Sequence, residues 1–159
     1  MGNQRTKENQ GTSYSYRNLD LWQRAQELAV RVIKLTEGFP STAAASGLAR
    51  QIVGSAASIG ANIAEGHGRY SYAAYRQHLS IAKGSASETD SWLDLLRRIG
   101  YIDDATEADL HRQCRTILGA LTRRIRALEA GTQQMKTASI REENFTYGFD
   151  SEDGPGAIE

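Results

Sequence analysis

Apolar side chains recur three and four positions apart through most of the chain, a spacing that places them on one face of an α-helix. The first such stretch covers residues from about 19 to 37, and the second covers those from about 45 to 65. A third begins after Ser71 and ends at Gly100, and a fourth starts within residues 103–109 and ends near Leu128 or Glu129. No segment has a convincing strand period of two. The pattern predicts an all-α fold, an antiparallel up-down four-helix bundle with short connections.

The residues at the ends of these stretches are typical helix boundaries. Gly38 can adopt the left-handed C-cap conformation, and Pro40 forbids continuation of the first helix. Gly66 and Gly68 stand where the second helix should end. Ser71 is placed to accept a hydrogen bond from a free N–H of the third helix, an interaction of about 1 kcal/mol.

Two further local patterns concern the fourth and second helices. Thr106 and Asp109 have the spacing of a capping box, with aspartate in place of the preferred glutamate. The second helix contains many small residues, which should allow a neighbouring helix to approach closely: Gly54, Ser55, Ala57, Ser58, Gly60 and Ala61.

The segment "ANIAEGHGRYS", residues 61–71, gathers several reactive residue types between the second and third helices. Glu65 beside His67 would suit metal binding or general base catalysis, but a zinc site needs three or four ligands. His78 and His111 lie within helices and have no His or Cys four residues on. We therefore expect no catalytic residue, metal or cofactor here, and interpret the segment as a structural turn defined by Asn62, Glu65, Gly66, Gly68, Arg69 and Ser71.

Composition fits one domain with polar ends. The chain has 159 residues, of which 40% are hydrophobic and 24% charged, enough to bury a core. Residues 18–130 are predicted to form the bundle, residues 1–17 a flexible tail, and residues 131–159 a disordered tail with an excess of acidic side chains. The single cysteine, Cys114, is expected to be a buried small hydrophobe. A lone cysteine and the lack of a signal or membrane-spanning run favour a cytoplasmic protein with no membrane partner.

The fourth helix has the most distinctive charge pattern in the sequence. Between Leu110 and Ala127 it contains five arginines and no acidic residue. An eleven-residue step returns to within about 20° of the starting direction on an α-helix, so Arg112, Arg123, Arg115 and Arg126 share one face. The apolar residues occupy roughly the opposite arc, which predicts that this face points away from the core.

Two interpretations of this face remain open. It is either a solvated helix surface, since arginine is a good helix former, or a phosphate-binding strip for RNA or DNA. The formal net charge of +0 argues against a protein that coats nucleic acid through bulk charge alone. A strip on one protomer would bind weakly, so oligomerisation would strengthen it.

Several segments resemble one known family. They are "LDLWQRAQELAVRVIKLTEGFP", "GLARQI", "IGANIAEGHGRYS", "HLSIAKGSASE" and "LRRIGYI", and together they cover about residues 18–128. The most specific are "NIAEGHGR" at 62–69 and "AKGS" at 82–85. With this separation they resemble the 23S rRNA intervening-sequence proteins, a family of four-helix bundles.

The resemblance implies an assembly more than a reaction. Relatives form ring-shaped homopentamers, and some resemble the accessory protein of diversity-generating retroelements, which binds a reverse transcriptase and nucleic acid. It therefore implies a non-enzymatic homo-oligomer with RNA, DNA or a reverse transcriptase as candidate partners. The family name records genomic location, so ribosomal function does not follow from it.

The sequence also departs from the family pattern. Relatives commonly read like "QIRRAAVSIPSNIAEG", whereas this chain has Val53 and Gly54 in place of two basic residues and Gly60 in place of proline. These changes remove local positive charge and leave the shape of the second helix open. Arg50 and Arg69 join the four arginines of the last helix as candidate nucleic-acid-binding residues. A protein-interaction scaffold without nucleic-acid binding is the alternative function.

Overall fold

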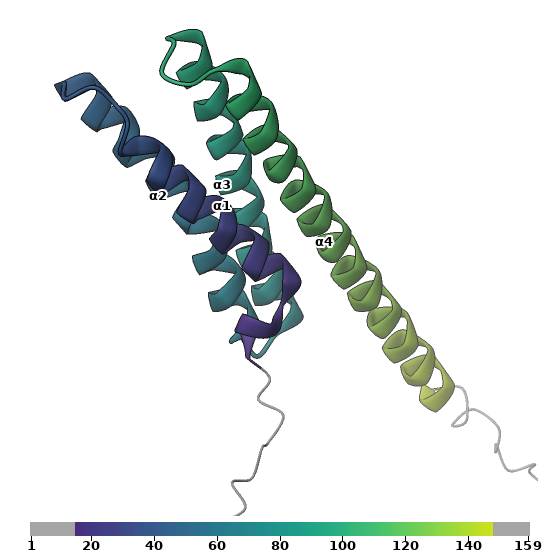
Figure 1. Cartoon of the computed structure of the whole chain (residues 1–159). Coiled ribbons are helices and arrows are strands. Elements are labelled where there is room, and N and C mark those ends of the chain that lie inside the picture. Colours follow the sequence, from purple (N-terminus) through teal and green to yellow (C-terminus); the bar gives the residue numbers. More distant parts are fainter. Residues whose placement is uncertain (1–14, 148–159) are drawn as a thin grey trace, which may run out of the picture.

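Four α-helices make up almost all of the described chain (Figure 1). The computed structural model describes residues 15–147, with side chains described as far as residue 134. Those residues contain no strand, as the apolar spacing predicted. A short 3-10 helix, η1 (Tyr16–Asn18), precedes α1 (Asp20–Thr36), α2 (Ala43–His67), α3 (Tyr72–Arg98) and α4 (Asp104–Tyr147).

Each helix packs against the next one along the chain. Helix α1 also contacts α4, which closes the four helices around a common core. The pairs α1 with α3 and α2 with α4 make no close backbone contact within the described residues, so they are the diagonals of the bundle. The predicted antiparallel up-down bundle is therefore confirmed. In Figure 1, α4 continues well past the ends of the other three helices.

The core takes apolar side chains from all four helices. In α4 they are Leu110, Cys114, Ile117 and Leu121, each at most 1% exposed. Ile33 of α1 belongs to the same apolar spacing, but it is 43% exposed. The preceding residue, Val32, lies in the core instead, because the buried face of α1 consists of Ala25, Leu28, Ala29 and Val32.

The small residues of α2 pack against two different helices, α3 and α1. Ser55 is buried against α3, where its hydroxyl lies 3.0 Å from that of Thr89. Gly60 is buried against α1: a Cβ atom there would lie 2.3 Å from the Gln26 side-chain nitrogen. Gly54 is exposed and has open space around it, so only part of the set provides close approach. The helix is continuous through Gly60.

The ends of α2 and α3 largely follow the prediction. Ser71 caps α3, accepting a hydrogen bond from the Ala74 N–H at 3.1 Å. Gly68 is the C-cap of α2, but Gly66 lies inside the helix and is buried. Among the described glycines, Gly100 alone has a positive φ, of 75°. The left-handed cap expected at Gly38 is therefore wrong.

The start of α4 differs from the predicted capping box. Asp103 accepts a hydrogen bond from the Thr106 N–H at 2.7 Å, so the cap lies three residues earlier than Thr106. Asp109 is not part of a cap, because its carboxylate pairs with Arg31 and Arg112. An aspartate before the helix satisfies a free N–H directly, which removes the need for the box.

The end of α4 also differs. The helix was predicted to stop near Leu128 or Glu129, yet it continues to Tyr147. Residues 131–147 were assigned to a disordered tail because their apolar residues are sparse, but no glycine pair or proline interrupts them. Residues 148–159 and 1–14, also predicted to be tails, lie outside the described residues. Residues 16 and 17 of the predicted N-terminal tail belong to η1.

Candidate functional site

The arginine stripe, defined as Arg112, Arg115, Arg123 and Arg126, lies on the outer face of α4. All four residues are exposed, whereas the core residues of the same helix are buried on the opposite arc. The sequence predicted this arrangement from the helical period alone. The stripe is thus a row of exposed arginines on the face of α4 opposite its core residues.

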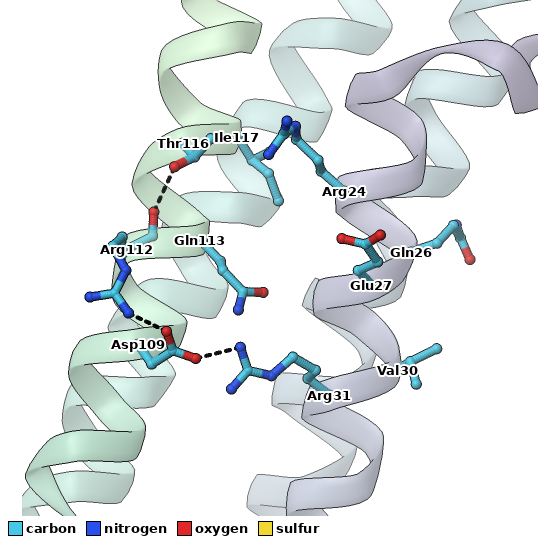
Figure 2. A pocket seen from close by; sticks show the side chains of 10 residues that line it. All are labelled: Arg24, Gln26, Glu27, Val30, Arg31, Asp109, Arg112, Gln113, Thr116 and Ile117. Atoms are coloured by element: carbon cyan, nitrogen blue, oxygen red, sulfur yellow. Dashed lines mark hydrogen bonds and ion pairs between the residues drawn. The ribbon is translucent and has the colours of Figure 1, made fainter.

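The four guanidinium groups differ in what surrounds them. Arg112 pairs with Asp109, which also pairs with Arg31 of α1 at 2.5 Å. Figure 2 shows this three-residue cluster between α4 and α1. Among residues 15–134, Arg115 and Arg126 make no ion pair, so their charge is open to a partner. The stripe is therefore partly neutralised at its N-terminal end and uncompensated further along.

Two further arginines expected at the interface do not join the stripe. Arg50 is exposed on α2, which is diagonal to α4 and makes no close backbone contact with it. Arg69 lies in the connection between α2 and α3 and pairs with Glu65 four residues earlier. The structure thus separates the six candidates into one four-residue array and two isolated positions.

The turn motif proves to be one end of a network of polar side chains between α2 and α3, here called the polar seam. Glu65 pairs with Arg69 and lies 3.8 Å from His78 Nε2. His78 Nδ1 lies 3.4 Å from the Asn62 side-chain oxygen, and the Asn62 amide donates to the Ser58 carbonyl at 2.9 Å. These contacts give Glu65 and Asn62 structural roles.

The polar seam continues into the middle of the bundle. The hydroxyls of Ser85 and Ser58 lie 2.9 Å apart, and Thr89 contacts both Ser55 at 3.0 Å and the Ser85 carbonyl at 2.8 Å. No buried side-chain polar atom of the described residues lacks a partner. Sequence reasoning missed His78, Ser58, Ser85 and Thr89 as a set. Small polar residues three and four apart in two consecutive helices were the signal.

A groove between α1 and α4, here called the side groove, has a volume of about 740 Å³. Its walls include Val30, which is 48% exposed, and the buried Ile117. The Arg31, Asp109 and Arg112 cluster lies along it, with Gln113 beside them (Figure 2). This groove could not be predicted from the sequence, because its existence depends on how far α1 and α4 are separated.

A second groove, here called the end groove, lies where the start of α1 approaches α4. Its volume is about 460 Å³, and most of its lining is apolar. Arg123 of the stripe lines it, together with Arg124 and Tyr75. The Arg124 guanidinium lies 5.8 Å from the centre of the Tyr75 ring, within the range of a cation–π contact.

The structure also describes the single cysteine, the possible metal ligands and the polarity of the helices. Cys114 is fully buried, and burial raises the pKa of its thiol to about 12, with the nearby charge of Asp90 adding to the effect. This agrees with a small core residue. Within the described residues, no group of three His, Cys, Asp or Glu side chains could hold a metal ion. Every helix of that part is too short or too polar to cross a bilayer.

The model of one protein family, described as 23S rRNA-intervening sequence protein, matches residues 17–123. This chain belongs to that family. The match covers α1, α2, α3 and the first half of α4, so it includes the polar seam and every stripe residue except Arg126. No curated protein matches this chain.

A solved structure supports the same assignment. The family member resembles a crystal structure from Bacteroides thetaiotaomicron VPI-5482, titled a protein with unknown function from the S23 ribosomal protein family. The two sequences are 31% identical, and the TM-score is 0.62. The similarity covers 66% of this chain and 97% of that one. The two proteins thus share the helical bundle.

The two segments that carried the family resemblance meet in the structure of this member. "NIAEGHGR" supplies Asn62 and Glu65 of the polar seam, and "AKGS" supplies Ser85. These segments lie on different helices that pack together, which gives a physical reason for their fixed separation in sequence. Their chemistry is that of helix pairing, and the stripe lies on a different helix.

Proposed function

We propose that this protein is a non-enzymatic, homo-oligomeric helical bundle that binds RNA or DNA through the arginine stripe of α4. The observation that carries the proposal is the outward array of guanidinium groups, in which Arg115 and Arg126 make no ion pair within the described residues. Arginine presents several donors in a fixed fork that matches phosphate oxygens. A linear array of such groups fits the repeating charge of a nucleic-acid backbone.

Oligomerisation is part of the proposal because one stripe offers few contacts. Each phosphate neutralised contributes a slope of about −0.7 to −0.9 in log affinity against log salt concentration. Four contacts give weak binding at moderate ionic strength, whereas copies of the stripe on several protomers act together. The resemblance to ring-forming relatives supports a homopentamer, and that to a retroelement accessory protein supports a reverse transcriptase as a protein partner.

The test is a change of Arg112, Arg115, Arg123 and Arg126 to glutamine. Binding of labelled RNA and DNA, followed by fluorescence anisotropy, should weaken, and the slope against log salt should become less negative by roughly three if all four contact phosphates. A control variant changes Arg76, Arg97 and Arg98, which lie outside the stripe and are paired with carboxylates. An unchanged affinity in the stripe variant would reject the stripe as the binding site.

A protein-interaction scaffold without nucleic-acid binding is the second candidate. It is favoured by the exposure of Val30 and Ile33 on α1 and by the pairing of Asp109 with two arginines, which neutralises part of the basic surface. The wild-type protein separates the two candidates. Absence of binding to both RNA and DNA at low ionic strength would favour the scaffold, and a solution mass measurement would give the subunit number.

A further inference from the structure

The end groove combines an apolar lining with a basic rim. Leu19 and Leu21 contribute from the start of α1, Ile63 from α2 and Ala127 from α4. Its volume of about 460 Å³ lies within the range of roughly 300–1,000 Å³ that is typical for small-ligand sites. Because Arg123 belongs both to the groove and to the arginine stripe, the groove opens beside the proposed backbone-binding surface.

The aromatic wall of the groove is held in position by its neighbours. The Tyr75 ring packs against Gly66, where an added Cβ atom would lie 2.9 Å from the ring. The Arg124 guanidinium lies over the same ring, 5.8 Å from its centre. A ring fixed in this way loses little freedom when a planar ligand enters the groove.

The charge at the rim favours an anionic ligand. Within the described residues, neither Arg123 nor Arg124 forms an ion pair. Asp20 also lines the groove, but its carboxylate pairs with Arg24 at 2.8 Å. The same end of the bundle carries the connection between α2 and α3, where the Tyr70 side chain is fully exposed. The groove thus suits a ligand with a flat apolar part and a neighbouring negative charge.

We propose that the end groove binds an unpaired base of a single-stranded nucleic acid while Arg123 and Arg124 contact the adjoining phosphates. This inference rests on the proposed function and adds a preference for single strands. A base within a duplex is stacked and paired, so it cannot enter a groove in the protein without leaving the helix. Stacking on aromatic side chains accepts any base, so we expect little sequence preference.

The test changes Ala127 to phenylalanine, which places a large side chain at the exposed edge of the groove without altering charge. Anisotropy titrations should show that the wild-type protein prefers a labelled single strand to the duplex of the same sequence. Ala127→Phe should lower affinity for the single strand about fivefold or more, which corresponds to the loss of one stacked base, and leave the duplex unaffected. Ala57→Phe, on an exposed position of α2 outside this groove, is the matched control.

Two additional measurements make the result decisive. Arg124→Gln removes the charge without filling the groove. This variant should also lower the affinity for the single strand more than the affinity for the duplex. A fluorescent adenine analogue in the single strand should change its emission on binding to wild type but not to Ala127→Phe. Circular dichroism and urea unfolding confirm that each variant folds.

The outcomes separate this inference from the proposed function. If the stripe variant loses binding while Ala127→Phe binds the single strand normally, the groove is not a base site and the stripe stands. If Ala127→Phe changes the mass of the assembly in solution, the groove is a contact between subunits and the inference is wrong. If wild type binds neither strand form at low salt, both proposals are rejected.

Discussion

At the scale of single residues, the glycines of α2 show how one atom decides packing. Gly66 is buried where a Cβ atom would lie 2.8 Å from the Cβ of His78 and 2.9 Å from the Tyr75 ring. Gly54 lies in the same helix, but no atom of another helix lies within 4 Å of the equivalent position. Both glycines lower helix propensity, but only Gly66 is required by its neighbours.

We predict opposite effects of alanine at these two glycines. Gly66→Ala should lower the free energy of unfolding by about 1–3 kcal/mol, because His78 and Tyr75 must move. Gly54→Ala should raise it by about 0.5–1 kcal/mol, because it restricts the unfolded backbone and meets no atom. Urea unfolding followed by circular dichroism measures both. Equal effects of the two substitutions would contradict the role given to Gly66.

A second prediction at this scale concerns the thiol of Cys114. Its pKa rises from 9.0 to about 12 in the fold, so the thiolate population near pH 8 falls roughly a thousandfold relative to the unfolded chain. Iodoacetamide should label the native protein far more slowly than the protein in denaturant. The unfolded chain releases this proton above about pH 9 while the folded chain keeps it, so stability should fall between about pH 9 and 12. Rapid native labelling would show that the thiol is exposed.

At the scale of helices, α2 and α3 are joined by hydroxyl and amide side chains as well as by apolar packing. Ser55, Ser58 and Asn62 recur along α2, and their partners Thr89, Ser85 and His78 recur along α3 in the reverse order. This antiparallel order fixes the axial register of the pair, since a shift of one turn would leave buried hydroxyls unpaired.

We predict that Ser85→Ala weakens this pairing. The variant loses the contact with the Ser58 hydroxyl, which should lower the free energy of unfolding by about 1 kcal/mol. Ser87→Ala is the control on the same helix, because Ser87 is exposed and should change stability by less than about 0.5 kcal/mol. The midpoints of urea unfolding of the two variants and the wild type measure the difference. If both variants have the wild-type midpoint, the polar seam does not stabilise the bundle.

At the scale of the whole molecule, the bundle is closed where α1 meets α4. Arg31 and Asp109 form an ion pair across this junction at 2.5 Å, and the side groove lies beside it. Hydrogen bonds from Arg31 first, and then from Arg112, hold the pKa of Asp109 below its ordinary value of 3.8. The carboxylate thus stabilises the fold above about pH 4, and this contribution is lost as the pH falls through the lowered pKa.

The corresponding prediction uses Asp109→Asn. The wild-type protein should lose more stability than this variant when the pH is lowered from 6 to 3, because only the wild type has this carboxylate to protonate. Urea midpoints at the two pH values measure the difference. Asp104→Asn, at a side chain that is 90% exposed, is the control for the loss of one carboxylate. An identical acid response of Asp109→Asn and wild type would show that the ion pair does not close the bundle.

The periodicity of the sequence by itself determined four helices, their approximate bounds and the outward face of α4. These features depend on which side chains repeat along one helix, and that information is local. The same reasoning misplaced the end of α4, because sparse apolar residues predict the absence of a core but do not terminate a helix. The sequence predicted the helix cap at Ser71 but not the cap at Asp103, because two adjacent aspartates leave the capping residue ambiguous.

Only the tertiary structure decided which polar groups meet. The pairing of Asp109 with Arg31, and of Ser58 with Ser85, joins residues from different helices. Their distances depend on helix separation and rotation, which no single-helix period contains. The same holds for the end groove, since Ile63, Tyr75 and Arg124 come from three helices. Sequence therefore specified the surfaces of this protein one helix at a time, and packing specified which of those surfaces remain available to a partner.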